Sequence, residues 1–119
     1  MTPSEVHAKL MTLFPEFAGY WESPHNYHRD EDGSFTLCGV FAQFSTFVRE
    51  QVSHLQPTAL AELGRFIEQC MELPPSSDLR NAAGACFLEN VAGEEFTPAL
   101  AAHFGSRARE ILSYYGPVA

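Results

Sequence analysis

Lysine is almost absent from this sequence. Lys9 is the only lysine in 119 residues, and Lys and Arg together number 7 against 15 Asp and Glu. The formal net charge of −8 argues against non-specific binding to nucleic acid or to an anionic membrane, because such binding begins with the neutralisation of phosphate. We therefore expect neither nucleic acid nor membrane as a partner, whereas a basic protein would suit this charge.

Long apolar runs are also missing. The longest uncharged stretch, residues 33–48, is interrupted by polar side chains and is too short to span a bilayer, so it predicts a buried helix. The first ten residues contain no basic segment followed by an apolar run, so the sequence predicts no signal peptide. Both observations favour a cytoplasmic protein.

Cysteine is scarce and its number is odd. Cys38, Cys70 and Cys86 are widely spaced, and each lies within an apolar helical pattern. None has a basic neighbour within a helical turn that would activate a thiol. We expect all three to act as small hydrophobic residues in a reducing cytoplasm.

Recognisable catalytic motifs are absent as well. The sequence contains no Gly-x-Ser-x-Gly, no phosphate-binding glycine loop and no His-Glu-x-x-His. Catalysis by paired carboxylates requires two acids held in different environments, but the available acids, Glu94–Glu95 and residues 30–32, are adjacent and solvated. The sequence therefore predicts neither an enzyme nor a cofactor.

The residues that are abundant suffice for a folded core. With 45% hydrophobic and 13% aromatic residues, a chain of this size should bury about two-thirds of its unfolded surface. Helical spacing of the apolar residues predicts one all-α domain over residues 1–119, a bundle of five to six helices. The expected helices are 3–14, 35–55, 58–73, 79–91, 97–105 and 106–115, with a short additional piece at 16–21. Residues 61–79 resemble residues 82–100 at an offset of 21, so stacked helical repeats are an alternative architecture.

Several polar residues predict where these helices begin. Thr2 and Glu5 have the spacing of a capping box, and Ser76 or Ser77 is expected to cap the helix that follows the double proline. By the same reasoning Thr58, Thr97 and Ser106 are expected to cap the later helices.

The segment from Glu22 to Gly33 has no periodicity and predicts a loop. It holds the chain's one cluster of potential metal ligands: His25, His28, Asp30, Glu31 and Asp32. His-x-x-His can bind zinc, but no second ligand cluster follows it. A calcium loop fails because Gly39 would occupy the twelfth position, where a glutamate is required. We expect a solvated loop without metal.

The same region combines aromatic and acidic side chains. Tyrosine and tryptophan are frequent anchors of protein interfaces, and acidic groups steer a basic partner. The candidate partner-binding residues are Tyr20, Trp21, Tyr27, Asp30, Glu31 and Asp32. The alternative is that Tyr20 and Trp21 complete the core while the rest of the segment is simply loop.

Two polar pairs, Arg80–Asn81 and Glu89–Asn90, lie on a helix that is otherwise apolar. Buried polar groups need partners, so we expect these side chains to form an ion pair or to cap a neighbouring helix end. A pocket in which Arg80 holds an anion is the alternative.

Four segments carry a resemblance to a known family. They are Leu13-Phe14-Pro15-Glu16-Phe17, Arg80-Asn81, Phe87-Leu88-Glu89-Asn90 and Phe104-Gly105-Ser106-Arg107. In this combination the chain resembles an uncharacterised family of small bacterial all-helical proteins, which is similar to the immunity proteins that neutralise polymorphic toxins. The resemblance spans most of the chain and implies a helical domain without an established enzymatic role. Residues 26–32 match no part of that pattern, and we expect individual function there.

Together these observations predict a non-enzymatic cytoplasmic protein-binding domain. The most concrete form of this hypothesis is an immunity protein whose acidic face masks a basic toxin. One alternative is a small-ligand or metal-binding module around His25 and His28. Another is a self-associating adaptor, because ten phenylalanines make a homodimer interface credible.

Overall fold

The computed structural model describes residues 1–118, which are all-α and contain no strand. The helices are α1 (Pro3–Leu13), α2 (Phe17–Trp21), α3 (Leu37–Gln51), α4 (Pro57–Met71), α5 (Asp78–Ala82), α6 (Glu89–Val91), α7 (Thr97–Ala101) and α8 (Ser106–Ser113). A 3-10 turn, η1 (Val52–His54), extends α3, and a π-helix, η2 (Ala83–Leu88), joins α5 to α6. Residues 78–91 thus form one continuous helix. The predicted all-α fold is confirmed.

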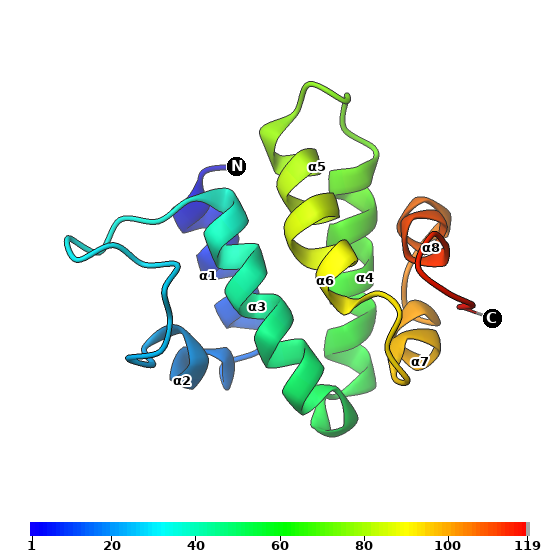
Figure 1. Cartoon of the computed structure of the whole chain (residues 1–119), viewed down its shortest axis with the longest axis horizontal. Coiled ribbons are helices and arrows are strands. Elements are labelled where there is room, and N and C mark those ends of the chain that lie inside the picture. Colours follow the sequence, from blue (N-terminus) through cyan, green and yellow to red (C-terminus); the bar gives the residue numbers. More distant parts are fainter. Residues whose placement is uncertain (119) are drawn as a thin grey trace.

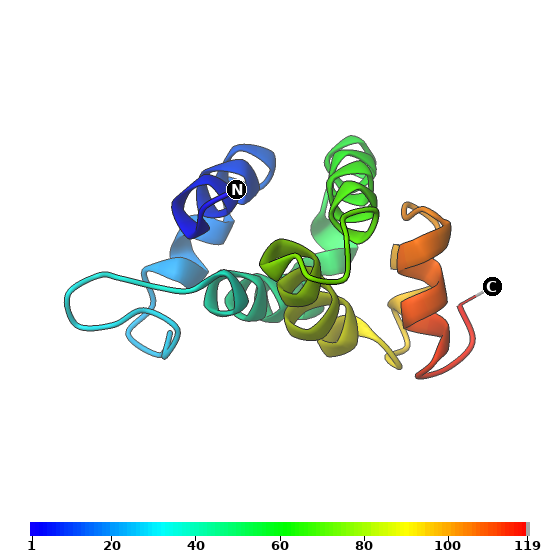
Figure 2. The same cartoon turned by 90° about the horizontal axis from the view of Figure 1, so that it is seen from above.

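The long helices form two layers. In Figure 1 the chain runs down α3, up α4 and down residues 78–91. Seen from above, α1 and α4 lie on one side, and α3 and the 78–91 helix lie on the other (Figure 2). Helix α8 lies at the end opposite to the loop of residues 22–36, which projects away from the helices. The principal extents are 42 × 34 × 23 Å.

Caps formed by residues three apart were predicted correctly. The Thr2 hydroxyl accepts from the backbone N–H of Glu5 at 3.1 Å, and Glu5 in return accepts from the N–H of Thr2 at 2.8 Å. Ser77 accepts from the N–H of Arg80. Helix α3 starts at Leu37, two residues later than expected, because the Thr36 hydroxyl accepts from the N–H of Gly39.

The predicted caps of three later helices were wrong. Helix α4 begins at Pro57, one residue before the expected cap Thr58. Thr97 lies inside α7, where its hydroxyl donates to the carbonyl of Val91 at 2.6 Å. Ser106 lies inside α8, whose N-cap is Gly105 and has no side chain to offer.

A residue from another helix caps α8 instead. The Glu68 carboxylate, on α4, accepts from the backbone N–H groups of Arg107 and Ala108, each at 3.1 Å. These are two of the N–H groups that lack a partner within the first turn of a helix. The negative charge also suits the partial positive charge at a helix N-terminus.

The core is rich in phenylalanine and is shared by both layers. Phe17 and Phe44 meet edge to face with 5.1 Å between ring centroids, and Phe44 lies 5.6 Å from Phe87. Phe14, Phe41 and the other large buried side chains surround these contacts. Aromatic rings each bury about 150–250 Å² and account for much of a core's stability. The two ring contacts of Phe44 thus join α2, α3 and η2.

Two side chains of the polar pairs on the 78–91 helix bond to backbone carbonyls, Arg80 at the end of α4 as expected and Asn90 within its own helix. Arg80 Nη1 donates to the carbonyl of Leu73 at 3.2 Å, and Asn90 Nδ2 donates to the carbonyl of Cys86 at 2.8 Å. Arg49 of α3 donates to the carbonyl of Asn90. The Arg80 bond thus supports the structural interpretation of the first pair.

Candidate functional site

The loop of residues 22–36 is organised by hydrogen bonds within it. Asn26 is buried, donates through Nδ2 to the carbonyl of Trp21 at 2.9 Å, and accepts at Oδ1 from the N–H of His28 at 2.9 Å. His28 then passes close to α3: a Cβ on Gly39 would lie 3.1 Å from the His28 carbonyl oxygen. The loop is therefore held against the first turn of α3.

The acidic tip of the loop has its own turn. The N–H of Asp30 donates to the carbonyl of Ser34 at 2.8 Å, and Gly33 adopts a φ of +87°, which favours glycine. The Ser34 hydroxyl and N–H both bond to Asp32, at 2.7 and 3.0 Å, and these bonds lower the pKa of that carboxyl. Asp30, Glu31 and Asp32 are all exposed, so the tip presents negative charge.

A hollow of about 390 Å³ lies between the loop and α3. Its lining consists of Tyr20, Ser23, His25, Tyr27, His28, Gln43, Thr46 and Glu50. The Tyr20 hydroxyl donates to Glu50 at 3.0 Å and accepts from Gln51 at 3.1 Å. Tyr27 is 86% exposed at the edge of this hollow. We call the cavity lined by these eight residues the loop hollow.

The predicted partner-binding residues fall into three groups. Tyr20 and Tyr27 both line the loop hollow. The three acids at the tip are exposed, but they are not among the lining residues. Trp21 is only 4% exposed and lies 4.8 Å from the rings of His7 and Phe35, so this tryptophan completes the core, as the alternative interpretation supposed.

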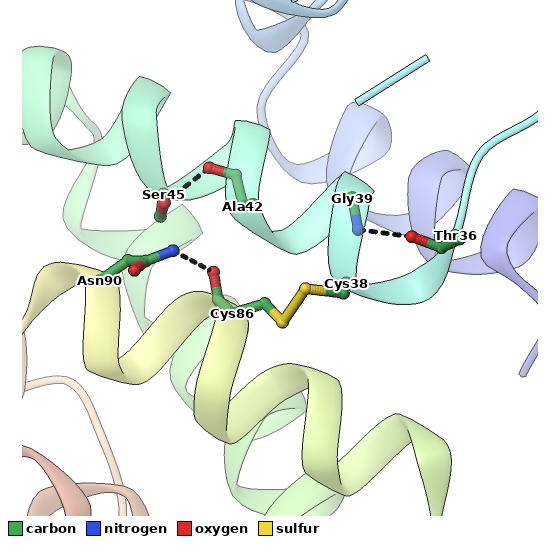
Figure 3. The surroundings of a disulfide bond; sticks show 7 residues. All are labelled: Thr36, Cys38, Gly39, Ala42, Ser45, Cys86 and Asn90. Atoms are coloured by element: carbon green, nitrogen blue, oxygen red, sulfur yellow. Dashed lines mark hydrogen bonds between the residues drawn. A yellow bond between two sulfur atoms is a disulfide. The ribbon is translucent and has the colours of Figure 1, made fainter. Parts of the chain in front are cut away.

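The expectation for the cysteines was wrong for two of the three. Cys38, in the first turn of α3, forms a disulfide with Cys86 of η2, across a sequence separation of 48 (Figure 3). Cys70 is free and buried. No local pattern in the sequence signals this pairing, because it depends on how α3 packs against η2.

A second hollow, of about 660 Å³, lies beside this disulfide. Its lining consists of Pro3, Phe35, Thr36, Leu37, Cys38, Asp78, Asn81, Ala82, Ala85 and Cys86. The walls come from the start of α1, the start of α3 and the 78–91 helix. Most of these side chains are apolar, and Asp78 is the one charged residue among them. We call this the disulfide hollow.

Residues 7–116 match a family described as a domain of unknown function, DUF7674. The chain belongs to this family. No curated protein and no solved structure matches it. The prediction that the chain belongs to an uncharacterised family is thus confirmed. Its likeness to immunity proteins stays a prediction.

Among residues 1–118, no three His, Cys, Asp or Glu side chains are grouped so that they could hold a metal ion. Within the same part of the chain, no helix has the length and hydropathy needed to cross a membrane. His25 and His28, the candidate zinc ligands, line the loop hollow.

Proposed function

We propose that this DUF7674 domain is a non-enzymatic, cytoplasmic protein-binding domain that recognises a basic surface of its partner. In its most specific form, the proposal is that the domain is an immunity protein and the partner a toxin. The observation that carries the proposal is Tyr27, which is 86% exposed beside the loop hollow on a hydrogen-bonded loop.

An exposed tyrosine on an ordered loop suits recognition. Tyrosine offers a large amphipathic contact with few rotatable bonds, and such residues dominate the energetics of many interfaces. Asn26 and Gly39 hold the backbone on either side of Tyr27 near α3, so that less conformational entropy is lost on binding. The neighbouring hollow offers space for a side chain of the partner.

The acidic tip supplies the electrostatic part of the proposal. Asp30, Glu31 and Asp32 are exposed, and the whole chain carries a formal net charge of −8. Complementary charges accelerate the encounter of two proteins and are screened by salt. We expect the association rate to fall steeply with ionic strength, and neutralisation of the tip to reduce that dependence.

The experiment is a pull-down from the native host at low salt, with bound proteins identified by mass spectrometry. Wild type is compared with Tyr27→Ala and with the triple variant Asp30→Asn, Glu31→Gln, Asp32→Asn. Tyr114→Ala is the matched control, because Tyr114 is a second exposed tyrosine, located just after α8. We expect one stoichiometric basic partner that the control retains and both loop variants lose.

Retention of the partner by all four proteins would contradict binding through the loop. Recovery of the protein alone would contradict the partner hypothesis and favour self-association, which light scattering would then measure. An association rate indifferent to salt would contradict recognition of a basic surface.

A further inference from the structure

The disulfide between Cys38 and Cys86 is open to solvent and borders a cavity. Cys38 is exposed, Cys86 is half-buried, and both residues line the disulfide hollow. Thiol–disulfide exchange requires that an attacking thiolate reach a sulfur atom, so access is a precondition for reaction. A molecule within the hollow would lie beside this bond.

Cys38 also occupies a position that favours a thiolate. It is the second residue of α3, a helix of 15 residues whose N-cap is Thr36. The partial positive charge at a helix N-terminus stabilises an anion in the first turn and makes a cysteine there a better nucleophile and leaving group. Figure 3 shows Cys38 at this end of α3, facing Cys86.

Cys86 lies in an unusual stretch of helix. It belongs to η2, a π-helix of six residues, and the side chain of Asn90 donates to its carbonyl (Figure 3). Segments of π-helix are rare and recur at functional sites. Its partner lies in an ordinary α-helix, so the two cysteines differ in both exposure and backbone setting.

We propose that Cys38 and Cys86 form a redox-active pair that exchanges with low-molecular-weight thiols admitted by the disulfide hollow. An external thiolate attacks Sγ of Cys38, the bond to Cys86 breaks, and Cys86 leaves with the electron pair and takes up a proton. A second thiolate attacks the sulfur of the bound thiol, and Cys38 leaves as a thiolate. Two external thiols are oxidised to one disulfide, and the protein disulfide is reduced to two thiols.

The lining of the hollow selects the class of thiol. Most of the lining side chains are apolar, and Asp78 is the charged one among them. An anionic thiol would meet both this carboxylate and the net charge of −8, whereas a cationic one would be attracted by them. The preferred reactant is therefore a small thiol compound whose other groups are cationic or neutral.

The third cysteine provides an internal control. Cys70 is 1% exposed, and burial raises the pKa of its thiol to about 11. Cysteine reactivity depends on the thiolate form and on access, and Cys70 lacks both. We expect Cys70 to remain unmodified as long as the protein is folded.

The test uses the native, full-length oxidised protein under anaerobic conditions. Cysteamine, a cationic thiol, and mercaptoacetate, an anionic thiol of similar size, are added in separate reactions at neutral pH. Samples are quenched with a maleimide and analysed by intact mass, while circular dichroism confirms that the fold persists. We expect labelling at two thiols. After each rate is divided by the thiolate fraction of the attacking thiol, cysteamine should be faster by about ten-fold, the lower end of electrostatic rate enhancements.

Variants assign the steps. For the Cys38 and Cys86 variants the symmetric disulfide cystamine replaces the thiol, and Cys86→Ser should then form a stable mixed disulfide at Cys38 with release of one cysteamine thiolate. The matched variant Cys38→Ser should react more slowly at Cys86, which lies away from a helix N-terminus. Asp78→Asn should reduce the preference for cysteamine. Cys70→Ser should behave as wild type.

Two outcomes would overturn the proposal. The first is a disulfide that resists both thiols until denaturant is added, which would make it a purely structural crosslink. The second is labelling of Cys70 together with the pair, because reaction would then require unfolding. Since the wild-type experiment needs no substitution, a variant that fails to fold leaves the test intact.

Discussion

The two sides of this molecule are joined to its central helices in different ways. On the C-terminal side the contact is close: a methyl group at Gly64 of α4 would overlap the carbonyl oxygen of His103, and Glu68 caps α8. On the N-terminal side, α3 and η2 are joined by a disulfide beside a hollow of about 660 Å³. Packing and a helix cap alone join the C-terminal helix, whereas between α3 and η2 a crosslink adds to the packing of Phe44 on Phe87.

Substitution of Gly64 by alanine should have the largest effect. The added methyl group meets backbone atoms of His103, which cannot move independently of the chain between α7 and α8. We expect the free energy of unfolding to fall by about 3 kcal/mol, at the upper end for overpacking. Urea denaturation followed by circular dichroism would measure it.

Gly19→Ala is the matched control for that substitution. Gly19 lies within α2, and nothing lies within 4 Å of the position its Cβ would take. Alanine has the higher helix propensity, so stability should stay constant or rise by up to about 1 kcal/mol. Equal losses in both variants would show that the close approach at Gly64 is not what stabilises the C-terminal side.

Reduction of the disulfide should have a smaller effect. Loop entropy alone predicts about 4 kcal/mol for a crosslink spanning a sequence separation of 48. We expect a loss of only about 2–3 kcal/mol, because the helix N-terminus stabilises the reduced form through the Cys38 thiolate by up to about 2 kcal/mol. The loss is measured from the urea midpoints with and without reductant. The Cys70→Ser protein is used for this, because without the free cysteine the unfolded chain cannot form other disulfides. A loss of 4 kcal/mol or more would indicate a structural crosslink and contradict exchange.

Removal of the cap on α8 ranks next. Glu68→Gln keeps an oxygen acceptor but removes the charge and one of two acceptor atoms, so we expect a loss of about 1 kcal/mol. Glu62→Gln is the control on the same helix, because Glu62 forms an exposed pair with Arg65, and such pairs contribute little. Urea midpoints of the two variants should differ accordingly. Equal midpoints would show that α8 needs no carboxylate.

The smallest expected effect concerns pH and His7, on the N-terminal side. Burial lowers the pKa of His7 below its ordinary value of 6.5, against a weaker opposing effect of Glu22. The unfolded chain therefore takes up this proton first, and the stabilising contribution, complete above pH 6.5, decreases as the pH falls below it. We expect His7→Gln to flatten the fall in urea midpoint between pH 7 and 5. If the urea midpoint of the variant falls as steeply with pH as that of wild type, His7 is not the source of the fall.

Local signals in the sequence predicted local structure well. The Thr2–Glu5 box and the Ser77 cap involve residues three apart, and the loop after Trp21 follows from its composition. Periodic apolar residues predicted the all-α fold, because burial of one helical face produces that pattern.

Features that depend on distant residues were not predictable in this way. Ser106 has the right chemistry for a cap, yet Glu68 supplies it from almost forty residues earlier in the chain. Cys38 and Cys86 were assigned to the core because their neighbours are apolar, although the packing of α3 on η2 brings them together at the surface. Of the candidate partner-binding residues, Tyr27 was recognisable as a loop residue, whereas Trp21 was ambiguous until its ring neighbours were known.

The crosslink also turns residues 38–86 into a closed ring that contains the exposed turn at Pro74, Pro75 and Ser76. A protease that cuts the backbone once within that turn would leave both fragments covalently attached. The nicked protein should migrate as one species on a non-reducing gel and as two after reduction. In an oxidising environment the cut chain would thus stay in one covalent piece, whereas in a reducing one only side-chain packing would hold α3 to η2.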